Sequence, residues 1–469
     1  MTREAKSILC GLDWTRPGRW SHPERGGRNR RVNKSGIALA GLWLALALAG
    51  CTILHSYTAA NTDRTMGHEP TRATLQIEGN DLPGGVFVGI AMSGGGSRAA
   101  NFSAAVLLEL EQLGFLRTTS ALSSVSGSSL VAAYYGLFGS DPARWNPDKV
   151  KELFRANLQS QWITRWFLPH NAVRYWFTDF DRSDIMKGVF DDVLFNGKTF
   201  GEMPKAGPRI LINATSLPNE GKFVFTDEAF ATLGSRLDTY PVSHAVMASG
   251  AFPGAFHNVT LRDFRNGGYD HLFDGGAADN LGVETLLEVT RRLYDPQTGQ
   301  GPRGCFFFLV DAYPFERGKG RDEPDTRHFL DFVLDDNVMD SSDVLLSLRR
   351  NDILQEAGFG EPGRIGVEPF RQFRVFPGRI GGPHCSAWHI TLQGLLVRDD
   401  LPPGARAVGK TVNQILTRYR LESPDAASAK ELQDRLFEAA KILVRQDEWT
   451  LRKACEWFRA NGVSGLGCP

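Results

Sequence analysis

The chain has 469 residues, of which 42% are hydrophobic and 23% charged, an ordinary composition for a globular protein. Lysine plus arginine and aspartate plus glutamate both number 53, so the formal net charge is zero. A neutral chain has no overall field that would attract nucleic acid or an acidic membrane surface, and the sequence contains no nucleic-acid-binding motif. We therefore expect no nucleic-acid partner.

The start of the chain has the pattern of an export signal. A basic run at 25–34 precedes the uncharged apolar stretch GIALAGLWLALALAG at 36–50, which is shorter than the about 20 residues of a membrane-spanning helix. The stretch leads into Cys51 through Leu-Ala-Gly, which resembles the lipobox of bacterial lipoproteins, where the cysteine is lipidated. We expect a signal peptide over 1–50 and a lipid-anchored protein of the bacterial cell envelope. Thr52 is not acidic, which favours the outer membrane; a plain secretory signal or a membrane anchor is the alternative.

The folded body is expected to start near residue 85. Residues 51–84 are polar and aperiodic, which predicts a flexible tether. The run VFVGIAM at 86–92 is typical of a strand buried on both faces, and the loop SGGGSR and a helical pattern follow it. In this layout the backbone N–H groups and the helix N-terminus converge on an anion. The anion is either a nucleotide phosphate or the oxyanion of an acyl-transfer intermediate, and the absence of a Lys-Ser/Thr pair disfavours the phosphate.

A second strand, turn and helix are predicted over 121–138, and Ser126 lies at the turn. Its neighbours Ser124, Gly127 and Ser128 are small, as the tight backbone of a nucleophile elbow requires. Successive strand–helix units predict a mainly parallel sheet, whose special turns meet at the carboxyl edge of the strands. We therefore expect the glycine loop to lie beside Ser126.

Residues 141–205 have helical spacing and many large aromatic side chains. They form either a helical insertion with its own small core, or a lid or lipid-facing surface, and the two are compatible.

The second half of the chain continues the pattern. A strand at 209–215 precedes a helix that ends at Gly250, and a short strand then leads to Asp274 on a tight Asp-Gly-Gly turn. The run CFFFLVDAY at 305–313 is the last clear core strand. Short strands near 373–375 and 389–392 and amphipathic helices follow, so residues 321–469 are interpreted as a mixed extension that packs over the catalytic body at 85–320.

The motifs SGGGSRA, SVSGSS and DGG, in this order, resemble those of the patatin-like phospholipases and the related cytosolic phospholipase A2 group, over about residues 85–315. The resemblance implies an α/β fold with a mainly parallel central sheet flanked by helices, and hydrolysis of phospholipid or other lipid esters without metal or cofactor. By motif, Ser126 is the nucleophile and Asp274 the general base of a Ser–Asp dyad. Gly94, Gly95 and Gly96 would supply oxyanion amides, and Arg98 would either bind a lipid phosphate or brace the loop. Lipidation at Cys51 would tether this enzyme to a membrane.

Two other functions remain open. One is a hydrolase triad of Ser126 with His328, His384 or His389, and the other is a lipid-anchored binding protein without activity. Four cysteines remain after residue 51, at positions 305, 385, 455 and 468, and export permits disulfides. The last two bracket a short loop and are candidates to pair. The cluster at 384–389 is interpreted as a structural loop in preference to a zinc site.

Overall fold

The computed structural model describes residues 58–65, 82–295, 297–314, 336–359, 365–376, 383–424 and 427–468. The predicted signal peptide, Cys51 and His328 lie outside the described residues. Among the helices that are described, none is both long and apolar enough to cross a membrane.

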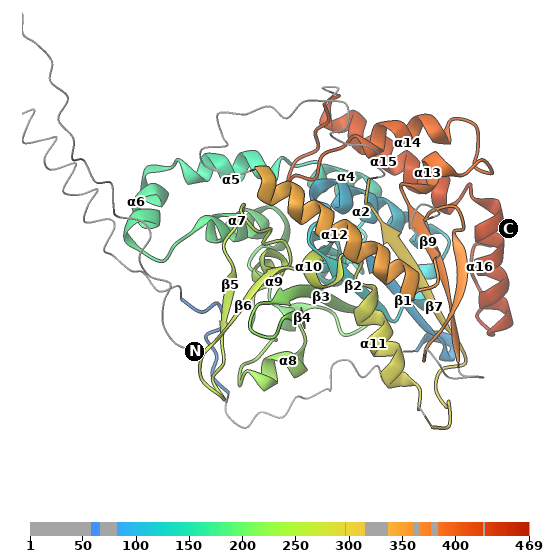
Figure 1. The fold of residues 1–469 in the computed structure, drawn as a ribbon, viewed down its shortest axis with the longest axis horizontal. Coiled ribbons are helices and arrows are strands. Elements are labelled where there is room, and N and C mark those ends of the chain that lie inside the picture. The colour runs from blue at the N-terminus through green and yellow to red at the C-terminus, as the bar shows by residue number, and fades with distance from the viewer. Residues whose placement is uncertain are drawn as a thin grey trace, which may run out of the picture. The chain divides into compact units, whose positions relative to one another are not determined.

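The described strands form one mixed sheet in the order β5-β6-β3-β2-β1-β7-β9-β8, with β4 paired to β3 (Figure 1). The central strands β3, β2, β1, β7 and β9 are parallel, and β4, β5, β6 and β8 pair antiparallel. This sheet confirms the predicted mainly parallel α/β class. The strand bounds are β1 Phe87–Met92, β2 Ala121–Val125, β3 Arg209–Ser216, β4 Gly221–Val224, β5 Val259–Arg262, β6 Tyr269–Asp274, β7 Cys305–Asp311, β8 Phe370–Arg374 and β9 His384–Thr391.

Helices cover both faces of this sheet. The α-helices are α2 Gly96–Gln112, α3 Gly127–Phe138, α4 Pro147–Phe154, α5 Leu158–Trp166, α6 Pro169–Phe177, α7 Arg182–Phe190, α8 Asp227–Thr232, α9 Val242–Ser249, α10 Gly276–Asp279, α11 Val283–Leu293, α12 Asp336–Glu356, α13 Gly394–Val397, α14 Ala405–Asn413, α15 Ala429–Val444 and α16 Glu448–Ala460. Short 3-10 or π turns are Pro83–Gly85, Phe115–Thr118, Asp191–Phe195 and Phe200–Glu202.

The two faces of β1 belong to two separate cores. Val88 and Ile90 pack in the larger core with residues of α2, α3 and α9, whereas Phe87 and Ala91 pack in the smaller core with residues of α11. Successive strand residues point to opposite faces, so a strand covered on both sides is apolar at every position. This burial explains the continuous apolar run from which the strand was predicted.

The C-terminal part completes the sheet as well as packing over it. β9 pairs parallel with β7, and α15 packs against α2. The sequence indicated only a short strand near 389–392, because the polar residues of HCSAWHIT interrupt the apolar pattern of a buried strand. Its residues from 385 to 391 are nevertheless buried.

The tether prediction is wrong for residues 58–65, which lie against β5. The backbone N–H of Ala60 donates to the Thr260 carbonyl at 2.8 Å, and that of Arg262 donates to the Asn61 side chain at 2.7 Å. Asn61 is only 4% exposed. A few specific hydrogen bonds therefore hold a polar segment that lacks any periodic pattern.

Two disulfides join the four cysteines that follow residue 51. Cys305–Cys385 connects the adjacent strands β7 and β9, and Cys455–Cys468 connects α16 to the residues after it. Because Cys385 is bonded to another sulfur, it is not available as a zinc ligand. In the described part of the chain, no group of three or more His, Cys, Asp or Glu side chains is suited to hold a metal.

Candidate active site

Ser126 lies on a sharp turn between β2 and α3. Its backbone has φ 51° and ψ −121°, a left-handed conformation that is rare for a residue with a side chain. The turn is so tight that a Cβ on the next residue, Gly127, would overlap the carbonyl oxygen of Gly96. This is the geometry of a nucleophile elbow, with the serine at the N-terminal end of a helix.

A buried serine fixes the backbone of this elbow. The Ser126 N–H donates to the hydroxyl of Ser249, at the end of α9, at 2.8 Å, and this hydroxyl donates to the Asn213 carbonyl on β3 at 2.6 Å. Sequence analysis missed Ser249 and Asn213, because nothing in their local sequence separates them from packing residues.

Asp274 ends β6 and faces Ser126. The Ser126 hydroxyl is close enough to act on the Asp274 carboxyl as a hydrogen-bond donor, and the Gly276 N–H donates to Asp274 Oδ1 at 2.8 Å. Burial raises the pKa of Asp274 from 3.8 to about 6, although both hydrogen bonds act to lower it. A carboxylate with this pKa is a stronger base than an exposed one and still ionises near neutral pH.

The glycine loop lies against the elbow, as predicted, but its three amides are not equivalent. The Gly94 N–H donates to the Asn280 carbonyl at 3.0 Å, so the prediction of Gly94 as an oxyanion donor is not supported by this geometry. No described residue accepts a hydrogen bond from the amides of Gly95 and Gly96. These two glycines have φ values of 134° and 56°, which favour glycine. Two amides therefore remain for an anion.

Arg98 is buried, with 2% exposed, and its guanidinium is directed at protein acceptors. It donates to the Ala312 carbonyl at 2.9 Å, to the Ile415 carbonyl, and to the Thr417 hydroxyl at 3.0 Å. Of the two predicted roles, these contacts are those of a brace between the glycine loop and residues 415–417.

Tyr419 reaches Ser126 from the C-terminal part of the chain. Its hydroxyl donates to the Gly250 carbonyl at 2.9 Å and lies close enough to Ser126 to act as its hydrogen-bond partner. Its ring lies 5.7 Å from the rings of Phe190 and Phe256. Burial raises the pKa of this phenol above its usual value of 10, so Tyr419 is neutral at physiological pH. Its position in an aperiodic polar segment gave no sequence signal.

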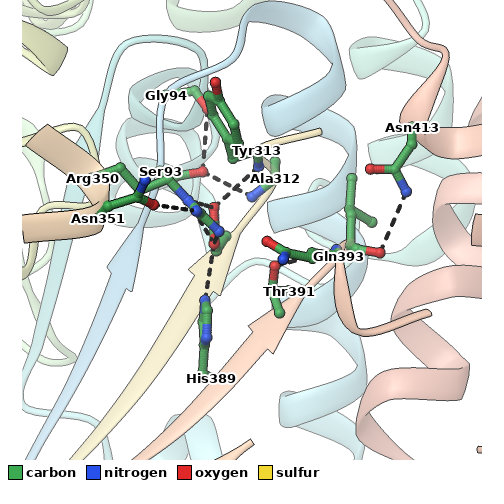
Figure 2. A network of polar contacts seen from close by, with 12 residues as sticks. Ser93, Gly94, Ala312, Tyr313, Arg350, Asn351, His389, Thr391, Gln393 and Asn413 are labelled. Carbon is green, nitrogen blue, oxygen red and sulfur yellow. Dashed lines mark hydrogen bonds and ion pairs between the residues drawn. The ribbon is translucent and has the colours of Figure 1, made fainter. Parts of the chain in front are cut away.

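Of the three histidines of the alternative triad, the two that are described, His384 and His389, make no hydrogen bond with Ser126. His389 Nε2 lies 2.9 Å from Asp311 Oδ2, and both side chains are fully buried. Figure 2 shows Arg350 and His389 converging near Ser93 from different elements, and both contact the carboxylate of Asp311. Arg350 and His389 hold the pKa of Asp311 below its usual range, and burial lowers the pKa of His389.

This buried cluster supports the glycine loop. The Ala312 N–H, next to Asp311, donates to the Ser93 hydroxyl at 2.9 Å, and the Ser93 hydroxyl donates to the Gly94 carbonyl at 3.2 Å. The other candidate, His384, is exposed at the first position of β9. His389 is therefore part of a structural junction between β7, α12 and β9.

Residues 90–287 match the family model described as patatin-like phospholipase. No curated protein gives a match. Among solved structures, human GIVD cytosolic phospholipase A2 with methyl gamma-linolenyl fluorophosphonate inhibitor and terbium chloride aligns at 14% identity and a TM-score of 0.46, over 82% of this chain and 61% of that one. The same human protein in another structure aligns at 14% identity and a TM-score of 0.45, with the same coverage.

A third structure, VipD from Legionella pneumophila, aligns at 12% identity and a TM-score of 0.25, over 80% of this chain and 77% of that one. The present chain thus spans about three fifths of the length of the human phospholipase A2 chains. The similarity to patatin-like phospholipases rests on the sequence match over residues 90–287, and these distant structures carry no argument about function.

Proposed function

Because residues 90–287 form a patatin-like phospholipase domain, a domain of lipid acyl hydrolases, we propose that this chain cleaves carboxylic ester bonds of phospholipids through Ser126 and Asp274. The observation that carries the proposal is a serine on a strained elbow, Ser126, within reach of a buried carboxyl group, Asp274, on which its hydroxyl acts as a donor. A serine hydroxyl is a weak nucleophile until a base takes its proton, and Asp274 is in position to take it.

The acylation step would start with attack of Ser126 Oγ on the ester carbonyl carbon, while its proton passes to Asp274. The carbonyl oxygen becomes negatively charged in the tetrahedral intermediate. The amides of Gly95 and Gly96 would donate to it, and removal of one such donor typically reduces kcat by about 10²–10³. The intermediate then collapses, the bond to the alcohol oxygen breaks, and Asp274 returns the proton to this leaving oxygen.

Deacylation would repeat the sequence with water. Asp274 takes a proton from the water, whose oxygen attacks the acyl-enzyme carbonyl, and the same two amides stabilise the second oxyanion. Collapse releases the fatty acid, and the proton returns to Ser126 Oγ. Every step uses groups of this chain, so no metal or cofactor is needed.

We further propose that the enzyme is exported and tethered to a membrane through lipidated Cys51, with the outer membrane favoured. The lipobox-like sequence before Cys51 supports the tether. The disulfides Cys305–Cys385 and Cys455–Cys468 support export, because disulfides persist in oxidising compartments.

The test measures fatty-acid release from phospholipid vesicles by the wild-type chain, Ser126→Ala and Asp274→Asn. Asp270→Asn is the matched control, since Asp270 is also a buried carboxyl of β6 but accepts from Ser216 at 2.7 Å. We expect the two dyad variants to fold and lose release, and the control to retain it. Activity of Asp274→Asn together with inactivity of His389→Gln would favour a triad. No release by any form would favour a binding protein.

A further inference from the structure

Helices α5 and α6 present an exposed aromatic surface, and we name residues 158–178 the aromatic arm. In Figure 1 the arm lies at an edge of the described body, beyond the end of the sheet. Phe167 is 78% exposed and Trp176 69%. The exposed apolar side chains of the arm are Ile163, Phe167, Leu168, Val173, Trp176 and Phe177. Single exposed apolar residues are common, but a cluster of this kind marks an interaction surface.

The charges of the arm fit an anionic lipid surface. Residues 158–178 contain no aspartate or glutamate, and their ionisable side chains are Arg165, His170, Arg174 and Tyr175. Arg165 also pairs with Asp192 at 2.7 Å, outside the arm. Aromatic and basic side chains without carboxylates are the composition of segments that lie in a membrane interface.

The base of the arm is hydrogen-bonded to a segment that closely follows the proposed lipid anchor in the chain. The Thr58 N–H donates to the Asp179 carboxylate at 2.9 Å, and Asp179 directly follows the arm. Six residues lie between Cys51 and Thr58, and the seven residue steps that join them span at most about 25 Å when extended. A lipid on Cys51 would therefore hold the base of the arm within this distance of a bilayer.

The arm is also connected to Tyr419. The Gln159 N–H, in the first turn of α5, donates to the Tyr419 carbonyl at 3.1 Å. The ring of Trp162 lies 5.2 Å from that of Phe256, which lies 5.7 Å from that of Tyr419. A displacement of α5 would thus act on Tyr419 through its backbone and through a continuous row of rings.

Tyr419 competes with the general base in the described arrangement. A phenol hydroxyl has one proton, and that of Tyr419 is donated to the Gly250 carbonyl. Toward Ser126 it can then only accept, so Tyr419 and Asp274 are two acceptors within reach of the single hydroxyl proton of Ser126. Removal of Tyr419 would leave this proton to Asp274 and uncover the nucleophile.

We propose that the aromatic arm is a docking surface for an anionic phospholipid bilayer, and that docking draws Tyr419 away from Ser126. This inference rests on the proposed function for its second half, the release of the catalytic serine. The first half, binding of the arm to lipid, is independent of catalysis.

The docking half is tested by flotation with vesicles of equal parts phosphatidylethanolamine and phosphatidylglycerol. The protein tested begins at Thr52, so that neither the apolar stretch at 36–50 nor a lipid on Cys51 contributes to binding. We expect Trp176→Ser with Phe177→Ser to weaken vesicle binding about tenfold or more, because two large apolar side chains no longer enter the interface. The matched control is Trp449→Ser, since Trp449 is 50% exposed on α16 and lies outside the arm.

Equal flotation of the double variant and the control overturns the docking surface. If neither form floats with vesicles, but the wild type dimerises and the double variant does not, the arm binds a second copy of the chain. This result would also overturn the lipid docking surface.

The second half is tested with a dispersed short-chain p-nitrophenyl ester, which forms no interface. We expect Tyr419→Phe, which keeps the ring but loses the hydroxyl, to cleave this ester about three- to tenfold faster than the wild type. Vesicles should stimulate the wild type and stimulate Tyr419→Phe less. If Tyr419→Phe is as inactive as Ser126→Ala, the hydroxyl serves catalysis and the release is refuted; an unchanged rate refutes it equally. If no form cleaves any ester, the proposed function fails, and flotation alone decides the docking surface.

Discussion

The burial of Asp274 makes a prediction about the pH dependence of the reaction. Its pKa is raised to about 6, and only the ionised form can accept the Ser126 proton. The rate constant kcat/KM should therefore rise with pH through an apparent pKa of about 6 and level off above pH 7. At pH 5 about a tenth of the carboxyl is ionised, so the rate should be about a tenth of the plateau.

The same pKa shift predicts that stability falls as the pH rises, whereas the activity rises. The net effect of burial and of the two hydrogen-bond donors disfavours the ionised form by about 3 kcal/mol, the equivalent of a shift in pKa from 3.8 to about 6. Because the folded state binds the proton more tightly than the unfolded chain, the contribution of Asp274 to stability is complete below pH 3.8. It is lost as the pH rises through 6. Asp274→Asn should thus be more stable than the wild type by up to about 3 kcal/mol at pH 8, and by little at pH 4.

Two measurements check this pair of expectations. Initial rates on a lipid ester between pH 4 and 9 give the rising limb, and urea unfolding of the wild type and Asp274→Asn at both ends of that range gives the stability difference. Asp270→Asn should retain the wild-type limb, since Asp270 contacts Ser216 and Asn219 and not Ser126. A rate that rises with an apparent pKa near 4 would contradict a desolvated base. An inactive Asp274→Asn variant that is less stable than the wild type at pH 8 would contradict it as well.

The remaining predictions concern the elbow, the buried junction and metals. Gly127→Ala should reduce kcat at least a hundredfold, because the added Cβ would overlap Gly96, whose amide is a proposed oxyanion donor. A wild-type rate in this variant would refute the close approach. Arg350→Met should lower the free energy of unfolding by about 3–5 kcal/mol, since it leaves Asp311 buried without its guanidinium partner. Arg349→Met removes a partly exposed pair and should cost about 1 kcal/mol or less, which equilibrium unfolding would distinguish. EDTA should leave fatty-acid release unchanged, because a carboxylate is the proposed base and amides meet the oxyanion; inhibition that added metal reverses would contradict this.

The sequence was sufficient for the features that local backbone geometry determines. The glycine loop and Ser126 follow β1 and β2, which are parallel neighbours, so the ends of these strands meet at one edge of the sheet. Asp274 is the last residue of β6, which pairs antiparallel with β3, and it lies opposite Ala214. Small residues around Ser126 and glycines in the loop at 94–96 are required by positive φ values and close contacts, so the same residues are visible in the sequence. These constraints predicted the α/β class and brought the motifs together.

The missed features depend on contacts between residues that are distant in the chain. Ser249 holds the Ser126 backbone from 123 residues away, and its surroundings are those of an ordinary buried helix. The Gly94 amide is engaged by Asn280, which no spacing between the two motifs indicates. Strand β9 is buried although its sequence is polar at several positions, because disulfide and hydrogen-bond partners satisfy Cys385 and His389. Periodicity cannot report such pairings.

The position of Tyr419 bears on how a carboxylate can act as the base at all. Asp274 is a strong enough base only while water is kept from it, and Tyr419 is one of the side chains over the dyad. Exchange of Tyr419 for water would lower the pKa of Asp274 and weaken the base. Exchange for an acyl chain would keep the site apolar. If the Tyr419 side chain leaves only when lipid replaces it, water is kept from Asp274 before, during and after substrate entry. The proposed link between the aromatic arm and Tyr419 would thereby maintain the raised pKa of the base.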